Sequence, residues 1–209
     1  NQLPINSSDQ VINLPRPVVY IDSNFRNAKC TSFENRNKAE LAYKKYIEPS
    51  IKLELKNKIQ KVMNENNLIA GEFSSIHIRG TDWYEAQVKT LRSQMFPLSF
   101  FSNILKENYD PNKKLFVMAD NDEAIEFLKT IYPNVVCYKE ATRASKYSGP
   151  SVHNSWNSPK SGDPKLAEDV IIESIIASQS EVFFHAEGNT DLIVLLLNSN
   201  LKNYYIKTI

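Results

Sequence analysis

Three clusters of polar residues in this chain carry side chains that bind phosphate, hold metal ions or move protons. They are His77-Ile78-Arg79-Gly80-Thr81-Asp82, Asp120-Asn121-Asp122 and His185-Ala186-Glu187-Gly188-Asn189-Thr190. The guanidinium of Arg79 suits a phosphate, because its planar fork donates two parallel hydrogen bonds. Gly188 suits an anion as well, because a helix that begins there presents backbone N–H groups without intrahelical partners. Asp120 and Asp122 resemble the D-x-D pair of metal-dependent sugar-nucleotide enzymes, in which two carboxylates hold a divalent cation.

Each cluster also has a purely structural interpretation. On a strand, His77 and Arg79 point to the same face, and Arg79 with Asp82 would then be a surface ion pair. In the third cluster Asn189 or Thr190 would cap a helix by accepting a hydrogen bond from a backbone N–H group. The acidic cluster would cap a helix in the same way, and we favour that interpretation over the metal site.

Alternating strand and helix patterns place all three clusters at the ends of strands. We expect strands at 17–21, 73–78, 115–119, 133–138, 181–185 and 203–207, and helices at 37–42, 50–66, 96–108, 123–131, 166–178 and 191–198. This alternation predicts an α/β fold, with a Rossmann-like parallel sheet and helices on both faces. Ligands of such sheets bind beyond the carboxyl ends of the strands, so the function is expected there.

The chain divides at Pro49, which interrupts a helical pattern. Residues 1–49 are expected to be an N-terminal arm and connecting segment, because 1–15 are polar with scattered apolar positions. Residues 50–209 are expected to form the Rossmann-like domain. Within it, 139–164 is a stretch rich in Ser, Pro, Gly and Asn. A loop of this length in a compact domain is usually functional or disordered.

The composition narrows the classes of function. Twenty-five Lys and Arg stand against 24 Asp and Glu, and a net charge of +1 gives no field that attracts nucleic acid or an anionic membrane. The five glycines are too dispersed for a G-x-G-x-x-G or P-loop motif, and the three histidines form no H-E-x-x-H. Cys30 and Cys137 form no C-x-x-C motif, which argues against a structural zinc site.

The sequence also indicates a compartment. No apolar run approaches the roughly 20 residues of a membrane span, and the N-terminus lacks the pattern of a signal peptide. Two cysteines are few, which favours a reducing, cytoplasmic environment, although one disulfide between them stays an open alternative. The lumen of the secretory pathway is the alternative if the chain is a fragment.

Five short motifs, in order, resemble the α-1,6-fucosyltransferases and the related nodulation fucosyltransferases. The residues from Ser75 to Asp82 are similar to the H-x-R-x-T-D segment of that family. Phe116–Asp122, followed by Tyr132-Pro133-Asn134, resembles the family's acidic turn and its Y-P-N. Val152-His153-Asn154 resembles its L-H-N. Val170-Ile171-Ile172-Glu173 resembles its V-I-L-D, and Ser178-Gln179-Ser180-Glu181 resembles its S-Q-A-D. The resemblance spans about residues 50–198, which is most of the chain.

The resemblance implies a fold and a reaction. The fold would be the carboxyl-terminal, nucleotide-sugar-binding half of a GT-B glycosyltransferase. The reaction would be an inverting transfer of fucose from GDP-fucose to a hydroxyl of a glycan or glycoconjugate acceptor. No metal or other cofactor is expected, and no nucleic acid or transmembrane segment takes part.

The resemblance also implies roles for individual residues. Arg79 would hold the β-phosphate and His77 would lie against the nucleotide. Glu173 stands where the family has an Asp that recognises guanine. The remaining donor-binding residues would be Asp120 beside the site, His153 in the loop, and Gly188, Asn189 and Thr190 at the phosphate.

The chain departs from the family pattern at several positions. Gln87 stands where the family has a Glu thought to act in catalysis, and Trp83 replaces a Lys. Glu85 or Asp82 would then be the base that accepts the proton of the acceptor hydroxyl. A GT-B enzyme needs a second α/β domain, and about 50 residues before Ser50 are too few for one. The chain is therefore expected to be a fragment or a minimal relative.

Two rival functions stay open beside this one. A non-catalytic nucleotide-sugar-binding module is favoured by Gln87 and by the missing first domain. A metal-dependent GT-A glycosyltransferase would use Asp120 and Asp122 as metal ligands. A fucosyltransferase-like enzyme that uses GDP-fucose is the leading interpretation, and these two are its alternatives.

Overall fold

All strands in the described part of the chain run parallel to their neighbours in one sheet. The computed structural model describes residues 9–11, 33–81, 97–146, 163–186 and 188–206. The strands lie in the order β1-β6-β5-β2-β3-β4. Their bounds are Asp9–Val11 (β1), Ser74–Ile78 (β2), Leu115–Ala119 (β3), Val135–Val136 (β4), Val182–His185 (β5) and Lys202–Tyr205 (β6). The predicted α/β class with a parallel sheet is confirmed.

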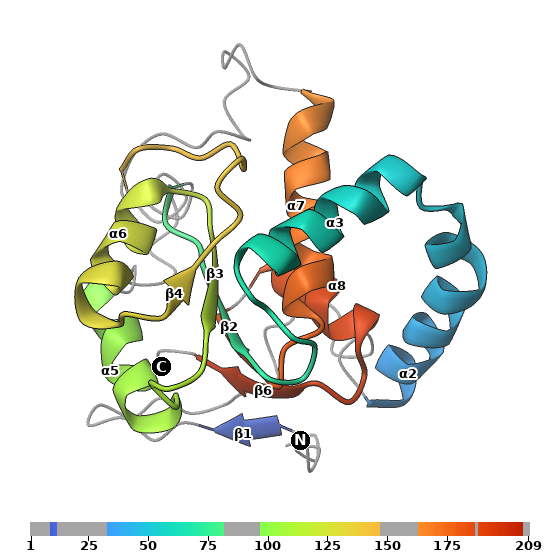
Figure 1. Ribbon diagram of the computed structural model, residues 1–209. Coiled ribbons are helices and arrows are strands. Elements are labelled where there is room, and N and C mark those ends of the chain that lie inside the picture. The colour runs from blue at the N-terminus through green and yellow to red at the C-terminus, as the bar shows by residue number, and fades with distance from the viewer. Residues whose placement is uncertain (1–8, 12–32, 82–96, 147–162, 187, 207–209) are drawn as a thin grey trace, which may run out of the picture.

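Helices cover both faces of this sheet (Figure 1). On one face lie α5 (Leu98–Asn108) and α6 (Asp122–Ile131), and their side chains share a core with alternate residues of the strands. On the other face lie α3 (Leu53–Glu65), α7 (Pro164–Ala177) and α8 (Asn189–Leu197), which share a second core. α2 (Phe33–Ala42) packs against α8, outside these layers.

β3 is apolar throughout because both of its faces pack against helices. In β3, Leu115 and Val117 belong to the core with α5 and α6, whereas Phe116 and Met118 belong to the core with α7. Successive side chains of a strand point to opposite faces, so two buried faces produce the continuous run Leu115–Ala119. The same alternation sends Ile76 and Ile78 of β2 to one core and leaves His77 on the side of α7 and α8.

The chain reverses its direction of travel across the sheet between β2 and β5. It moves outward from β2 through β3 to β4, and α7 then returns it to β5 on the other side of β2. Ser74 of β2 therefore pairs with Leu115 on one side and with Val182 on the other. A reversal of this kind leaves a crevice beyond the carboxyl ends of the two strands, where ligands of α/β folds bind.

Several boundaries differ from those predicted. The polar residues Asp9–Val11, expected in an arm, form β1 at the edge of the sheet, whereas the strand expected at 17–21 lies outside the described residues. The helix expected to start at residue 50 starts at Leu53, because Pro49 lies in a 3-10 turn (η3, Glu48–Ser50) and Ile51 is extended. η3 follows α2 through a π-helical turn (η2, Tyr43–Ile47).

No helix in the described ranges is long and apolar enough to cross a membrane.

Candidate functional site

A buried ion pair lies at the reversal between β2 and β5. Nδ1 of His77, near the end of β2, lies 2.6 Å from Oδ1 of Asp191 in the first turn of α8. Burial alone lowers the pKa of His77, but the charge and hydrogen bond of Asp191, with the charges of Asp120 and Glu173, outweigh burial and raise that pKa. These surroundings favour the charged form of His77 near the carboxyl edge of the sheet.

Gly188 provides the space for this pair. It is the N-cap residue of α8 and has an ordinary extended backbone. A Cβ at this position would lie 2.8 Å from Oδ2 of Asp191 and 3.8 Å from Cε1 of His77. Any side chain there would press on the carboxylate that holds His77, so glycine is required by a close approach and not by its φ angle.

The start of α8 differs from the predicted cap. We expected Asn189 or Thr190 to cap the helix, but Gly188 is the N-cap residue, and within the described residues no side chain caps this end. The helix starts at Asn189, and Thr190 is half-buried in its first turn. The first N–H groups of a helix have no intrahelical partners, and the acidic side chain in this first turn is Asp191.

Asp120 holds the turn that follows β2. Its Oδ2 accepts hydrogen bonds from the Thr81 hydroxyl at 2.7 Å and the Thr81 N–H at 3.0 Å, and its Oδ1 accepts from the Gly80 N–H at 3.0 Å. The side-chain amide of Asn121 donates to the same Oδ1 at 2.8 Å. Arg79, half-buried, immediately precedes this fixed turn. Asp120 thus positions the backbone next to the predicted phosphate residue.

The acidic cluster also caps α6, as predicted. The capping residue is Asn121, whose Oδ1 accepts a hydrogen bond from the N–H of Ala124 at 2.9 Å. Asp122 is exposed in the first turn of that helix. Among the described residues, no group of three or more His, Cys, Asp or Glu side chains is arranged to hold a metal ion.

Replacing Asp120 by asparagine is expected to loosen this turn. An amide NH2 would face the N–H donors of Gly80 and Thr81, which leaves buried donors unpaired at a cost of roughly 1–3 kcal/mol. Asp122→Asn is the matched control, because Asp122 is exposed and should change the free energy of unfolding by at most about 1 kcal/mol. Urea titration of both variants measures this difference. Equal losses in the two variants would contradict the role given to Asp120.

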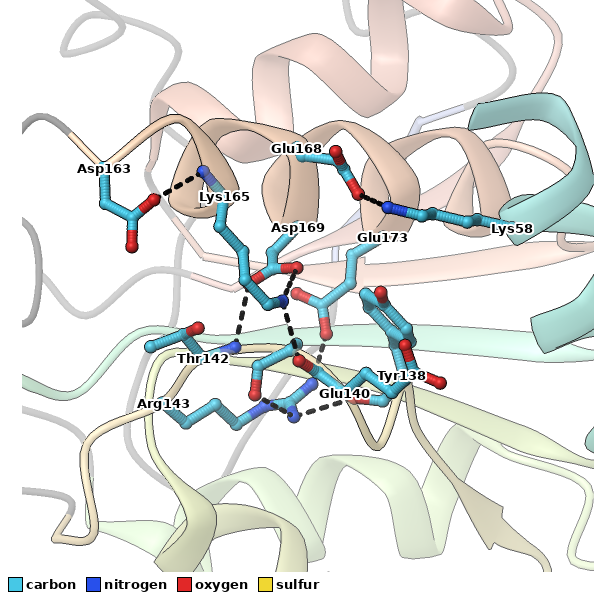
Figure 2. Close-up of polar contacts among 11 residues, drawn as sticks. Lys58, Tyr138, Glu140, Thr142, Arg143, Asp163, Lys165, Glu168, Asp169 and Glu173 are labelled. Carbon is cyan, nitrogen blue, oxygen red and sulfur yellow. Dashed lines mark hydrogen bonds and ion pairs between the residues drawn. The ribbon is translucent and has the colours of Figure 1, made fainter. Parts of the chain in front are cut away.

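Glu173 of α7 is paired with an arginine that the sequence analysis did not single out. Arg143, in the segment after β4, donates a hydrogen bond from Nη2 to Oε1 of Glu173 (Figure 2). Burial raises the pKa of Glu173 to about 7, although the charges of Arg143 and His77 and the bond from Arg143 lower it. Glu173 therefore changes its charge near neutral pH.

The structure brings together only part of the predicted site. His77, Gly80, Asp120 and Gly188 meet at the carboxyl edge, and the charge of Glu173 is felt by His77. Asp82, Glu85 and His153 lie outside the described residues. His185, in the third cluster, is buried and is engaged within the sheet instead: its Nε2 lies 3.1 Å from Oδ1 of Asn203 of β6, and its ring stacks on Phe183.

Two residues of the site were missed because their partners are distant in the sequence. Asp191 stands in the first turn of α8, three residues after Gly188. Acidic residues are common in the first turn of a helix, so its type alone gave no signal. Arg143 stands in a polar loop, where a charged side chain is normally solvated. The nearest signal in the sequence is the location of each, close to a strand end or a helix start.

Known proteins were compared with this chain by sequence and by structure. No protein-family model matches it, and no curated protein sequence matches it. The structure of NodZ α-1,6-fucosyltransferase co-crystallised with GDP is 10% identical over 70% of this chain and 41% of its own, with a TM-score of 0.41. The NodZ structure soaked with GDP-fucose is 12% identical over 70% and 42%, with a TM-score of 0.43. Fucosyltransferase NodZ from Bradyrhizobium is 13% identical over 70% and 41%, with a TM-score of 0.42.

This chain therefore spans about two fifths of the length of the solved structures that it matches.

Proposed function

We propose that this chain is the nucleotide-sugar-binding part of a fucosyltransferase-like glycosyltransferase, which transfers fucose from GDP-fucose to a glycan hydroxyl with inversion. The observation that carries the proposal is the reversal between β2 and β5. There the buried His77 pairs with Asp191 and lies beside Gly188 at the N-terminus of α8, and Arg79 follows it two residues later, where β2 has ended. These groups are a cation, a guanidinium and a helix N-terminus, all of which favour a diphosphate.

In this proposal the leaving diphosphate is stabilised by groups of the protein. Arg79 and the N–H groups that follow Gly188 neutralise the charge that grows on GDP as the glycosidic bond breaks. Asp82 or Glu85 accepts the proton of the acceptor hydroxyl. Since Arg79 supplies the positive charge, no metal ion is required. Glu173 recognises guanine, because a carboxylate accepts hydrogen bonds from both N1–H and the exocyclic amine.

The ionisation of Glu173 makes guanine recognition dependent on pH. Only the ionised carboxylate accepts from both donors, and the pKa of about 7 means that this form is lost as the pH falls below neutrality. The ratio of GDP affinity to UDP affinity should therefore rise about tenfold between pH 6 and pH 8. UDP is the control, because its diphosphate titrates as that of GDP does.

Calorimetry with the two nucleotides over this pH range tests the proposal. Tighter binding of GDP at pH 8, with the preference falling towards pH 6, is expected. Equal affinity for GDP and UDP at pH 8 would remove Glu173 from base recognition and weaken the assignment of a GDP-sugar donor.

A second candidate is a nucleotide-sugar-binding module without activity. It is favoured by Gln87, which stands where the resembled family carries a Glu thought to act in catalysis. Incubation with GDP-fucose and an acceptor in excess EDTA separates the candidates. Continued turnover supports the transferase, binding without turnover supports the module, and turnover that EDTA abolishes supports a metal-dependent enzyme that uses Asp120 and Asp122.

A further inference from the structure

We propose that Arg143 is the positioning residue that holds the carboxylate of Glu173 in place for guanine. This inference rests on the proposed function, since it concerns how that site selects its nucleotide. Arg143 does not contact the donor in this scheme. It acts through the carboxylate of Glu173, which would meet the base.

The guanidinium of Arg143 is fixed by the backbone. Its Nε donates to the carbonyl oxygen of Ala119, the last residue of β3, at 3.0 Å. Its Nη1 donates to the carbonyl oxygens of Tyr138 at 2.8 Å and Ala141 at 3.4 Å. Only 3% of its side chain is exposed. Because the guanidinium is a rigid plane, these bonds determine where Nη2 points, and it points at Glu173.

The pair is placed so that a carboxylate oxygen stays available. Figure 2 shows Arg143 reaching from the segment beneath α7 towards Glu173, whose carboxylate lies between the helix and that segment. Within the described residues, the bond from Arg143 uses Oε1. Each carboxylate oxygen accepts about two hydrogen bonds, so Glu173 still has acceptor sites for two guanine donors.

The charge of Arg143 opposes the effect of burial on Glu173. The charge of Glu173 interacts with five titratable groups around it. Arg143 and His77 favour its ionisation through their positive charges, and the other three are Asp169, Cys137 and Tyr138. Asp169, on α7 itself, disfavours ionisation. Without Arg143, burial and the charge of Asp169 would still raise the pKa of Glu173, and of the groups named here only His77 would still lower it. The carboxyl group would then be neutral at pH 7 and could not accept from both guanine donors.

A second connection joins the same two segments without contacting Glu173. Asp169 of α7 accepts hydrogen bonds from the N–H of Thr142 at 2.9 Å and from Nζ of Lys165 at 2.7 Å. Lys165 also donates to the carbonyl oxygen of Glu140 at 2.8 Å. Lys165→Met therefore removes a link between the loop and α7 close to Arg143, and it is the matched control for a merely structural effect.

The experiment measures GDP and UDP affinity by calorimetry from pH 6 to pH 9. For Arg143→Met we expect GDP affinity at pH 7 to fall tenfold or more, UDP affinity to change less than threefold, and the pH midpoint of GDP preference to rise by at least one unit. Arg143→Lys keeps the positive charge but loses the planar fork of donors, so its pH midpoint should lie between those of the native protein and Arg143→Met. Lys165→Met should keep the native preference and midpoint.

A double variant keeps the test valid if Arg143→Met folds poorly. Without Arg143 the buried carboxyl group of Glu173 lacks its partner, which is strongly destabilising, and Arg143→Met/Glu173→Gln removes that group. This variant should melt closer to the native protein than Arg143→Met does, yet bind GDP and UDP with similar affinity.

The experiment distinguishes a failure of the proposed function from a failure of the inference about Arg143. If the native protein does not prefer GDP, the proposed function fails and this inference fails with it. If the native protein prefers GDP, and either Arg143→Met keeps the native preference and midpoint or Lys165→Met loses them equally, the inference alone is overturned.

Discussion

Replacing Arg79 by lysine is expected to lower kcat about 100-fold or more and to weaken GDP binding. Lysine keeps the positive charge but loses the planar fork that binds two phosphate oxygens at once. The contribution of Arg79 grows as negative charge develops on the leaving GDP, so the loss should fall on kcat as well as on affinity. Removing one such charge-stabilising group typically lowers the rate by two to three orders of magnitude. Steady-state kinetics with GDP-fucose and calorimetry with GDP measure both effects.

An exposed ion pair elsewhere provides the control. Lys129 and Glu126 form a surface pair on α6 at 2.7 Å, with both side chains well exposed. Lys129→Ala should change the free energy of unfolding by about 0–1 kcal/mol and leave GDP binding unchanged. If Arg79→Lys and Arg79→Ala behave like this control, Arg79 is a surface cation and the case for a fucosyltransferase-like site loses its main residue.

Replacing Asp191 by asparagine is expected to cost the protein about 3 kcal/mol of stability at pH 6. The change keeps the shape of the side chain but removes the negative charge beside His77, whose protonated ring would be buried without a partner. At pH 9 the equilibrium is further towards the neutral ring, and the loss should shrink towards about 1 kcal/mol. Chemical denaturation at the two pH values measures the difference.

The direction of this pH dependence follows from the raised pKa of His77. A histidine whose pKa is higher in the folded than in the unfolded protein contributes stability that is complete below about pH 6.5 and is lost as the pH rises through the folded value. The variant should therefore approach the native protein in alkaline solution. Glu126→Gln, at an exposed position of α6, is the control and should show no such trend. A loss that is independent of pH would contradict a charged His77.

The central part of the fold follows from local patterns in the sequence. The run Leu115–Ala119 is apolar because both of its faces are covered, and it could be predicted as a buried strand for that reason. The strand Asp9–Val11 could not, because it is short and polar and is defined by pairing with β6 at the other end of the chain. Pairing between distant segments leaves no periodic signal in either one.

In the candidate site, too, some residues could be predicted from the sequence and others could not. His77, Arg79 and Gly188 could be identified because they stand where a strand ends or a helix begins, which is a local property. The partners of these residues could not. Asp191 of α8 binds His77, which stands on β2, far away in the sequence. Arg143 is held by the carbonyl oxygens of Ala119 and Tyr138. A backbone carbonyl has the same chemistry in every residue, so the sequence does not mark the ones that receive a side chain.

The placement of β5 beside β2 has a consequence for the order of folding during synthesis. β2, β3 and β4 leave the ribosome with α5 and α6, and these elements can assemble by contacts close in sequence. Phe116 and Met118, however, share a core with α7 and α8, which are made later, as well as with α3, which is made earlier. The nascent half-sheet therefore leaves part of one apolar face uncovered until α7 leads the chain back to β5 beside β2. Translation that stalls before α7 would leave a species prone to aggregate, whereas a stall after α8 would leave both faces of the central strands covered.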